Sequence, residues 1–172
     1  YAAIFSLHGA GVEASLLASQ YSPKDWAFVI TPTNRRPYGF DWQDWGRLDF
    51  LEVYDLAVKA LPIDKDRVYL SGGSMGGQGT WHIGLHHSSL FAALAPQAGW
   101  STLHVYQPFA MQPSRMFASP EILLSRERAR HDANNLFFLE NAEHLPVIIT
   151  QGAKDKTVPP MHARLFQKHL EI

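Results

Sequence analysis

Five short apolar runs recur along the chain, and each has the length of a buried β-strand. Glycine, proline or polar residues follow every run and end it. Between the runs lie stretches whose apolar residues have helical spacing, and this alternation is typical of a mostly parallel sheet with helices on both faces. The sequence therefore predicts an α/β fold with about five strands, at residues 1–7, 26–31, 67–71, 91–95 and 147–150.

Four stretches are expected to form helices. The clearest covers residues 49–61, where apolar side chains lie on one face and Pro62 ends the pattern. A last helix is expected to begin at Pro159 or Pro160, and a loop rich in aromatic residues is expected at residues 33–46. The two other expected helices are residues 12–20 and the stretch that follows residues 72–77 and ends at about residue 87.

The length of 172 residues favours a single domain over residues 1–172. Within it, residues 101–144 are rich in Met and Pro at first and charged farther on, which predicts an insertion or lid with some helix. The chain begins at Tyr1 inside an expected strand, so we expect the domain to be incomplete at that end. Any signal peptide would lie upstream of Tyr1 and would not be visible in this sequence, so the compartment does not follow from it. The oligomeric state does not follow from the sequence either.

Charge and composition narrow the function classes. Lys and Arg total 15 and Asp and Glu total 16, so the net charge of −1 gives no electrostatic case for binding nucleic acid or an anionic membrane. No apolar stretch is long enough for a membrane span. The chain has no Cys, which excludes disulfides, thiolate metal sites and a Cys nucleophile. His82 and His86 have the spacing of helical metal ligands, but His82 is not followed by the Glu of an HExxH site, so we expect neither a metal nor a cofactor.

Three turns that contain glycine directly follow expected strands. They are residues 8–11, 72–77 and 152–155. Because the carboxyl ends of parallel strands meet at one edge of the sheet, these turns are expected to converge on a common site.

The second of these turns, Gly72-Gly73-Ser74-Met75-Gly76, fits the G-x-S-x-G pattern between a strand and a helix. This turn holds its serine in a strained backbone conformation at the amino end of a helix, whose free N–H groups face a developing oxyanion. The sequence therefore predicts Ser74 as a nucleophile. The alternative is a glycine-rich turn with an incidental serine.

A tetrahedral intermediate needs two hydrogen-bond donors for its oxyanion. The backbone N–H of Met75, the residue after the nucleophile, is one expected donor. The N–H of Ala10, in the turn after the first strand, is the other, with Gly11 as the alternative. For His8, in the same turn, a structural hydrogen-bonding role is favoured over acid or base chemistry.

Asp155 follows the last expected strand, at the same edge of the sheet. A carboxylate there can orient an imidazole and stabilise the imidazolium form. The alternative is an Asp that caps a helix or turn without a catalytic partner. Asp49 and Asp55 lie on an expected helix and are interpreted as solvated or capping residues.

The segments SLHGAG, RVYLSGGSMGGQGTW and QGAKDKTVPP together resemble the α/β-hydrolase superfamily, in particular its prolyl-oligopeptidase-like and esterase branches. The resemblance covers nearly the whole chain. It implies a Ser–Asp–His triad without a metal, and hydrolysis of a small ester or peptide substrate through an acyl-enzyme. It assigns Ser74 as nucleophile, Asp155 as acid, and Met75 with residues 8–11 as the oxyanion hole.

The triad histidine of this superfamily follows the acid after one more helix and strand. His162 and His169 are downstream of Asp155, but both fall in the last expected helix, and His162 is expected on the helix surface. We therefore expect a chain truncated at both ends, whose terminal strands and catalytic His lie outside it. The alternative is a non-catalytic binding module of this fold, or an inactive fragment that lacks the His.

Three residues are candidates for substrate binding. Arg35, with Arg36 as the alternative, has the chemistry to pair with a substrate carboxylate, Tyr38 has the chemistry to line an acyl or aryl subsite, and Trp100 has the chemistry to roof a pocket. The structural alternative is that the aromatic residues hold a long loop on the domain, while Arg35 faces water or pairs with Asp41 or Asp44.

Overall fold

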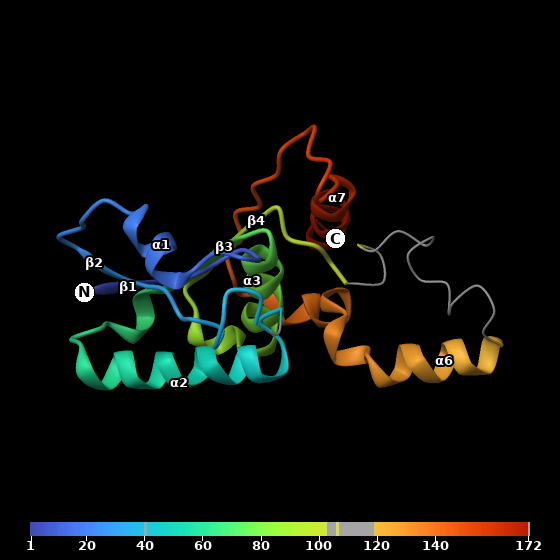
Figure 1. The fold of residues 1–172 in the computed structure, drawn as a ribbon, viewed down its shortest axis with the longest axis horizontal. Coiled ribbons are helices and arrows are strands. Elements are labelled where there is room, and N and C mark those ends of the chain that lie inside the picture. The colour runs from blue at the N-terminus through green and yellow to red at the C-terminus, as the bar shows by residue number, and fades with distance from the viewer. Residues whose placement is uncertain (40, 103–105, 107–118, 172) are drawn as a thin grey trace.

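A four-stranded parallel sheet forms the centre of the computed structural model, which describes residues 1–39, 41–102, 106 and 119–171 (Figure 1). The strands lie in the order β2–β1–β3–β4. The register places Leu7 beside Gly72 and Gly73 beside Gln97, so the carboxyl ends of β1, β3 and β4 lie next to one another. The bounds are β1 (Ala2–Leu7), β2 (Ala27–Ile30), β3 (Val68–Gly73) and β4 (Ala93–Gln97).

Residues 147–150 run alongside β4 and extend the sheet by a short parallel segment. Two bridges pair Leu94 with Val147 and Gln97 with Thr150. The N–H groups of Ile148 and Thr150 also donate to carbonyls of β4. The α/β class and the five expected strand positions are therefore confirmed, although the fifth makes two bridges instead of a continuous strand.

Helices cover both faces of this sheet. Figure 1 shows α1 (Ala14–Ser19) and α2 (Asp44–Ala60) on opposite sides of the strands. The helix after the glycine-rich turn, α3 (Met75–His86), packs against β3 and β4, and eleven of its residues are buried. The other helices are α6 (Pro120–Ala129), α7 (Met161–Leu170) and the short 3-10 helices η1 (Lys65–Arg67), η2 (Ser88–Leu90), η4 (His131–Ala133) and η5 (Asn135–Ala142).

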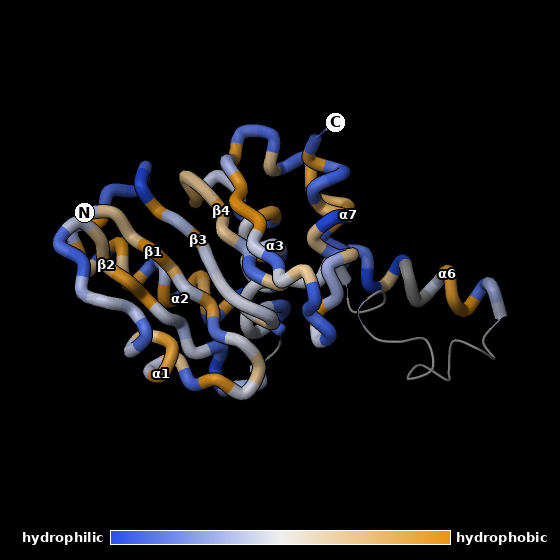
Figure 2. Tube along the Cα trace, turned by 90° about the horizontal axis from the view of Figure 1, so that it is seen from above, coloured by the Kyte–Doolittle hydropathy of each residue, from blue (hydrophilic) through white to orange (hydrophobic). Residues whose placement is uncertain are grey.

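The core lies between the sheet and α2 and α3. Phe5 of β1 is fully buried and meets the edge of Phe50 of α2, with ring centroids 5.4 Å apart. Figure 2 shows hydrophobic residues gathered in the strands, whereas several connecting loops are hydrophilic. Burial of alternate apolar side chains along β3, such as Val68 and Leu70, matches the pattern of a sheet packed on helices.

Two helical segments far apart in sequence from α3 pack against it. Phe166 of α7 stacks on Trp81 of α3, with centroids 3.9 Å apart and planes 12° from parallel. On another side, η5 contacts α3 and buries Leu139 and Ala142 in the core. The later part of residues 101–144 therefore contributes to the core, and a lid formed by this segment stays a prediction, because much of its first part lies outside the described residues.

The start of α2 differs from the expected one. The helix begins at Asp44, five residues before the apolar periodicity begins at Asp49, so the expected loop at residues 33–46 is shorter. Trp42, just before the helix, is fully buried and donates its Nε1–H to the His8 carbonyl at 3.1 Å. None of the described helices has the length and apolar character needed to cross a membrane.

Candidate active site

Ser74 lies at the sharp turn between β3 and α3, where it caps the amino end of the helix. Its backbone has φ 57° and ψ −118°, a conformation that side-chain-bearing residues rarely adopt. Its N–H donates to the Gln97 carbonyl at 2.9 Å, and its own carbonyl accepts from the Gln78 N–H at 3.0 Å. The strained strand-to-helix turn expected at Ser74 is therefore present.

Close backbone packing makes this turn possible. A Cβ on Gly76 would collide with the Leu7 carbonyl, because α3 begins directly against the end of β1. A Cβ on Gly9 would lie 3.7 Å from the Cβ of Ser74, which places the turn after β1 beside the serine. Two of the three expected turns thus meet at Ser74.

The backbone donors near Ser74 differ in their availability. Met75 is the first residue of α3, so its N–H has no acceptor within the helix. The Gly11 N–H donates to the Pro37 carbonyl at 2.9 Å, whereas the Ala10 N–H donates no hydrogen bond within the described part of the chain. Of the two alternatives in this turn, Ala10 is the donor that the geometry favours.

The side chain of His8 connects the turn at residues 8–11 to the backbone at Thr33. Its side chain is fully buried, with Nδ1 3.0 Å from the Gly9 carbonyl and Nε2 3.0 Å from the Thr33 carbonyl. The ring also meets Trp42 edge-on at 4.9 Å between centroids. A ring N–H on either nitrogen can therefore donate to a backbone carbonyl, which favours the structural role expected for His8.

Asp155 lies in the turn after residues 147–150. One of its carboxylate oxygens, Oδ1, accepts from the N–H groups of Thr157 at 2.8 Å and Val158 at 3.0 Å. These hydrogen bonds, first from Val158 and then from Thr157, lower the pKa of Asp155 below its usual value. The other oxygen, Oδ2, accepts from the Gln151 side chain at 3.3 Å and has capacity for a further donor.

The sheet fixes the relative placement of Ser74 and Asp155. Ser74 follows β3 and Asp155 follows the segment at residues 147–150, with β4 between them. Parallel strands two places apart in a sheet lie about 10 Å from each other, and this spacing separates the strand segments that precede Ser74 and Asp155. Among the described residues, neither the Ser74 hydroxyl nor the Asp155 carboxylate is hydrogen-bonded to a histidine.

The expectation that His162 lies on the helix surface is wrong. It is 1% exposed, and its Nδ1 lies 3.4 Å from the Ser101 N and 3.3 Å from the Ser101 Oγ. Burial lowers the pKa of His162. The periodicity of α7 alone could not reveal this burial, because it depends on where the segment after β4 lies.

Arg35 has protein partners that the sequence did not suggest. Its guanidinium lies 2.8 Å from a Glu52 carboxylate oxygen and 3.7 Å from one of Asp49. Asp41 and Asp44, the expected partners, are not those seen, and Asp49 is buried instead of solvated. These ion pairs favour the structural alternative for Arg35, since both partners come from α2.

The two aromatic candidates occupy different environments. Tyr38 is 72% exposed, and its hydroxyl lies against Gly11 in the turn after β1. Trp100 is buried and stacks on Tyr106, with ring centroids 4.4 Å apart. Tyr38 therefore borders the Ser74 region from the solvent side, and substrate binding by Tyr38, Trp100 and Arg35 stays a prediction.

Two residues missed by sequence reasoning support the site. Gln97 accepts the Ser74 N–H, and Gln151 donates to both Asp155 Oδ2 and the Val158 carbonyl. Gln97 is the last residue of β4, and Gln151 directly follows residues 147–150. Their positions at strand ends could be predicted from the sequence, but their hydrogen-bond partners could not.

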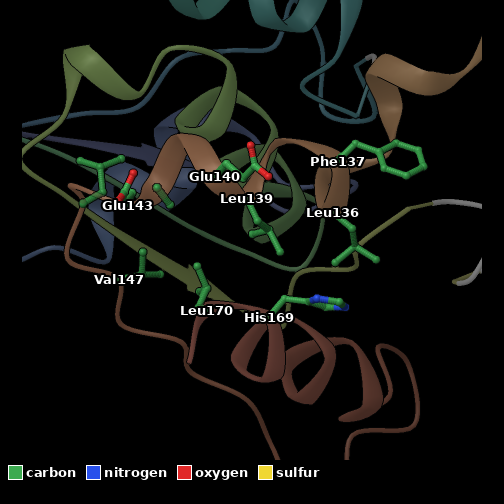
Figure 3. A pocket seen from close by; sticks show the side chains of 10 residues that line it. Leu136, Phe137, Leu139, Glu140, Glu143, Val147, His169 and Leu170 are labelled. Atoms are coloured by element: carbon green, nitrogen blue, oxygen red, sulfur yellow. The ribbon is translucent and has the colours of Figure 1, made fainter. Parts of the chain in front are cut away.

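A cavity of about 360 Å³ adjoins the Ser74 turn and is bordered by Gly9, Gly73 and Gln97. A larger hollow of about 950 Å³ lies between η5 and α7, where Figure 3 shows Glu140 and His169. That hollow is lined by none of the site residues, whereas the smaller cavity is bordered by residues next to Ser74 and by the turn after β1. Within the described ranges, no three His, Asp or Glu side chains come together as a metal site, and the His82 and His86 rings lie 4.3 Å apart.

Comparisons with known proteins agree with this fold. An uncharacterized secreted protein from Arthroderma benhamiae is 30% identical over 188 residues, which cover 98% of this chain and 19% of that protein. A thermostable esterase structure matches 99% of this chain and 43% of its own, with TM-score 0.67 and 19% identity. The acylaminoacyl peptidase of Pyrococcus horikoshii matches with TM-score 0.68 and 19% identity over 99% of this chain and 30% of its own.

A puromycin-hydrolyzing peptidase of Mycobacterium tuberculosis is similar to the same extent, with TM-score 0.68 and 20% identity over 98% of this chain and 28% of its own. The chain thus spans about a fifth of the curated relative and less than half of each solved structure. The family model of the prolyl oligopeptidase family matches residues 34–171. The chain therefore belongs to the prolyl oligopeptidase family.

Proposed function

We propose that the full-length protein is a serine hydrolase that cleaves an ester or amide through an acyl-enzyme. The Ser74 Oγ attacks the carbonyl carbon of the substrate, and its proton passes to a histidine base. Collapse of the tetrahedral intermediate breaks the bond to the leaving alcohol or amine, which takes that proton. Water then hydrolyses the acyl-enzyme by the same steps and releases the acid.

The observation that carries the proposal is the backbone of Ser74. A serine at φ 57° stores strain of about 1–3 kcal/mol, and such strain persists where the surrounding structure holds it in place. Here the Gln97 carbonyl, the Leu7 carbonyl beside Gly76 and the amino end of α3 provide that support. The conformation presents the hydroxyl at the carboxyl edge of the sheet, next to the turn after β1.

The oxyanion is proposed to bind the N–H groups of Met75 and Ala10. The first belongs to the free amino end of α3, where the helix dipole favours negative charge. The second lies in the turn whose Gly9 approaches Ser74, while the neighbouring Gly11 N–H is held by Pro37. Removing one donor of this kind costs about 100- to 1000-fold in kcat in serine hydrolases.

Asp155 is proposed to orient the base and to stabilise its protonated form. Hydrogen bonds from the Val158 and Thr157 N–H groups stabilise the ionised carboxylate and lower its pKa, and Oδ2 remains able to accept from an imidazole. The base itself is proposed to come from a histidine outside this chain. The engagement of His162 with Ser101 and the partial coverage of the solved relatives support that assignment.

The substrate class is proposed as a small ester or peptide. The structural relatives include an esterase and two peptidases, so ester and amide substrates are both tested. Tyr38, exposed beside Gly11, is the substrate-contacting candidate that the geometry favours most.

A catalytically silent binding module is the second candidate function. It is favoured by the absence of a hydrogen bond from any histidine to Ser74 or Asp155 among the described residues. Activity of the full-length protein separates the two candidates directly.

The test is hydrolysis by the full-length protein of arylated dipeptides and of short-chain and aromatic esters. We expect Ser74→Ala to reduce kcat by at least about 1000-fold and Asp155→Asn by about 1000- to 10,000-fold. Ser19→Ala, which removes an exposed hydroxyl that contacts only the Leu16 carbonyl of α1, serves as the matched control and should retain wild-type activity. Hydrolysis that survives in Ser74→Ala, or a wild type inactive on the whole panel, would count against the proposal.

A further inference from the structure

The turn that bears Asp155 is internally braced. The Asp155 N–H donates to the Gly152 carbonyl at 3.1 Å, and Oδ1 accepts from Thr157 and Val158. The Gln151 side chain joins Asp155 Oδ2 to the Val158 carbonyl, and Val158 itself is buried. Residues 151–158 are therefore held together as a unit, and the position of Asp155 depends on how this unit is attached to the domain.

Beyond residue 158 the chain enters α7, whose buried His162 attaches the unit to the rest of the domain. This side chain is 1% exposed, lies in the first turn of α7 and contacts Ser101 at two atoms. A backbone N–H can only donate, so the contact with the Ser101 N requires an unprotonated Nδ1 and places the ring proton on Nε2. The Tyr106 ring meets the imidazole edge-on, with centroids 6.1 Å apart.

Ser101 belongs to the segment after β4, and the start of that segment is hydrogen-bonded to the backbone of Ser74. The Gln97 carbonyl accepts the Ser74 N–H, the Ala98 N–H donates to the Thr150 carbonyl, and the chain then becomes buried at residues 99–102, which include Ser101. One continuous segment therefore contacts the backbone of Ser74 at its start and His162 at its end.

From this connection we propose that His162, as a neutral imidazole accepting from Ser101, is a positioning residue that fixes Asp155 relative to Ser74. The inference rests on the proposed function, because its effect is on the geometry of the triad. His162 does not touch the reacting atoms and acts through the turn that carries the acid.

The experiment compares H162N with H162L in the full-length protein. Asparagine places an amide oxygen near the position of imidazole Nδ1 and can accept from Ser101, whereas leucine fills a similar volume without an acceptor. Both kcat and KM for p-nitrophenyl ester hydrolysis are measured, together with the melting temperature. L85A, a buried change in α3, is the control for a general loss of stability.

We expect H162L to lower kcat by at least about tenfold with KM changed by less than about twofold, because a displaced acid impairs the chemical step. H162N should restore kcat to within about threefold of wild type. L85A should lower the melting temperature while retaining kcat at temperatures where it is folded.

Three results would overturn the inference. They are an unchanged kcat in H162L, an equal loss of kcat in H162L and H162N, and a loss that L85A reproduces. Should H162L fail to fold, H162Q replaces it: its oxygen lies one methylene farther out, so its kcat should fall well below that of H162N, and equal values would refute the proposal. A wild type without Ser74-dependent hydrolysis refutes the proposed function itself and this inference with it, whereas an active wild type with insensitive variants refutes the inference alone.

Discussion

At the scale of single residues, the strained Ser74 depends on the smallness of its neighbours. The turn brings the start of α3 against the Leu7 carbonyl at Gly76, and the Ser74 N–H reaches the Gln97 carbonyl of the next strand. Any atom added at Gly76 would force the helix away from β1. The conformation at Ser74 is thus a consequence of packing between β1, β3, β4 and α3.

Gly76→Ala tests this dependence. The added Cβ would collide with a backbone carbonyl that cannot rotate away, so we expect the free energy of unfolding to fall by about 1–3 kcal/mol. Gly73→Ala is the matched control, because a Cβ there meets nothing within 4 Å. Urea denaturation of both variants measures the difference, and equal losses in the two would show that the close approach at Gly76 is unimportant.

At the scale of elements, the sequence predicted what local patterns determine. The strand, glycine-rich turn and helix around Ser74 could be predicted because apolar periodicity and glycine spacing are local features. The start of α2 could not, because Asp44, Trp45 and Gly46 carry no apolar periodicity and the helix extends over them after the buried Trp42. The burial of His162 and the ion pairs of Arg35 also depend on tertiary contacts between distant segments.

The interface between α3 and η5 contains histidines that packing keeps neutral. Burial first, with smaller contributions from His86 and Arg47, lowers the pKa of His82 to about 3, while Asn135 acts in the opposite direction. Burial likewise lowers the pKa of His86 and His87, with Arg47 acting in the same sense on both and Asp132 opposing it at His86. These histidines bind fewer protons in the folded state than in the unfolded state.

This difference predicts acid sensitivity. The unfolded chain takes up protons at these histidines below about pH 6.5, whereas folded His82 does so only near pH 3, so stability is complete above the first value and is lost as the pH falls toward the second. Between about pH 7 and pH 5 the contribution of His82 should fall by about 1–2 kcal/mol, and His82→Gln should remove that part of the loss. Urea midpoints measured at both pH values provide the comparison.

His169→Gln, an exposed change on α7, is the control and should retain the pH dependence of the wild type. A loss of stability in acid that is as large in His82→Gln as in the wild type would contradict this assignment.

At the scale of the whole molecule, parallel strands bring together residues that are distant in the sequence. The ends of β1, β3 and residues 147–150 place the turn at residues 8–11, Ser74 and Asp155 along one edge. The sheet order was not required to predict this convergence, because the parallel arrangement alone implies it. The supporting contacts of Gln97, Gln151 and His162 required the folded structure, since each joins elements from different parts of the chain.

The central claim, that Ser74 is an activated nucleophile, is tested most directly by the site of covalent modification. The full-length protein is treated with a fluorophosphonate, digested, and its peptides are analysed by mass spectrometry. We expect a phosphonyl adduct on Ser74, in the peptide that spans the turn between β3 and α3. An adduct on another residue, or an active enzyme that carries no adduct at Ser74, would contradict it.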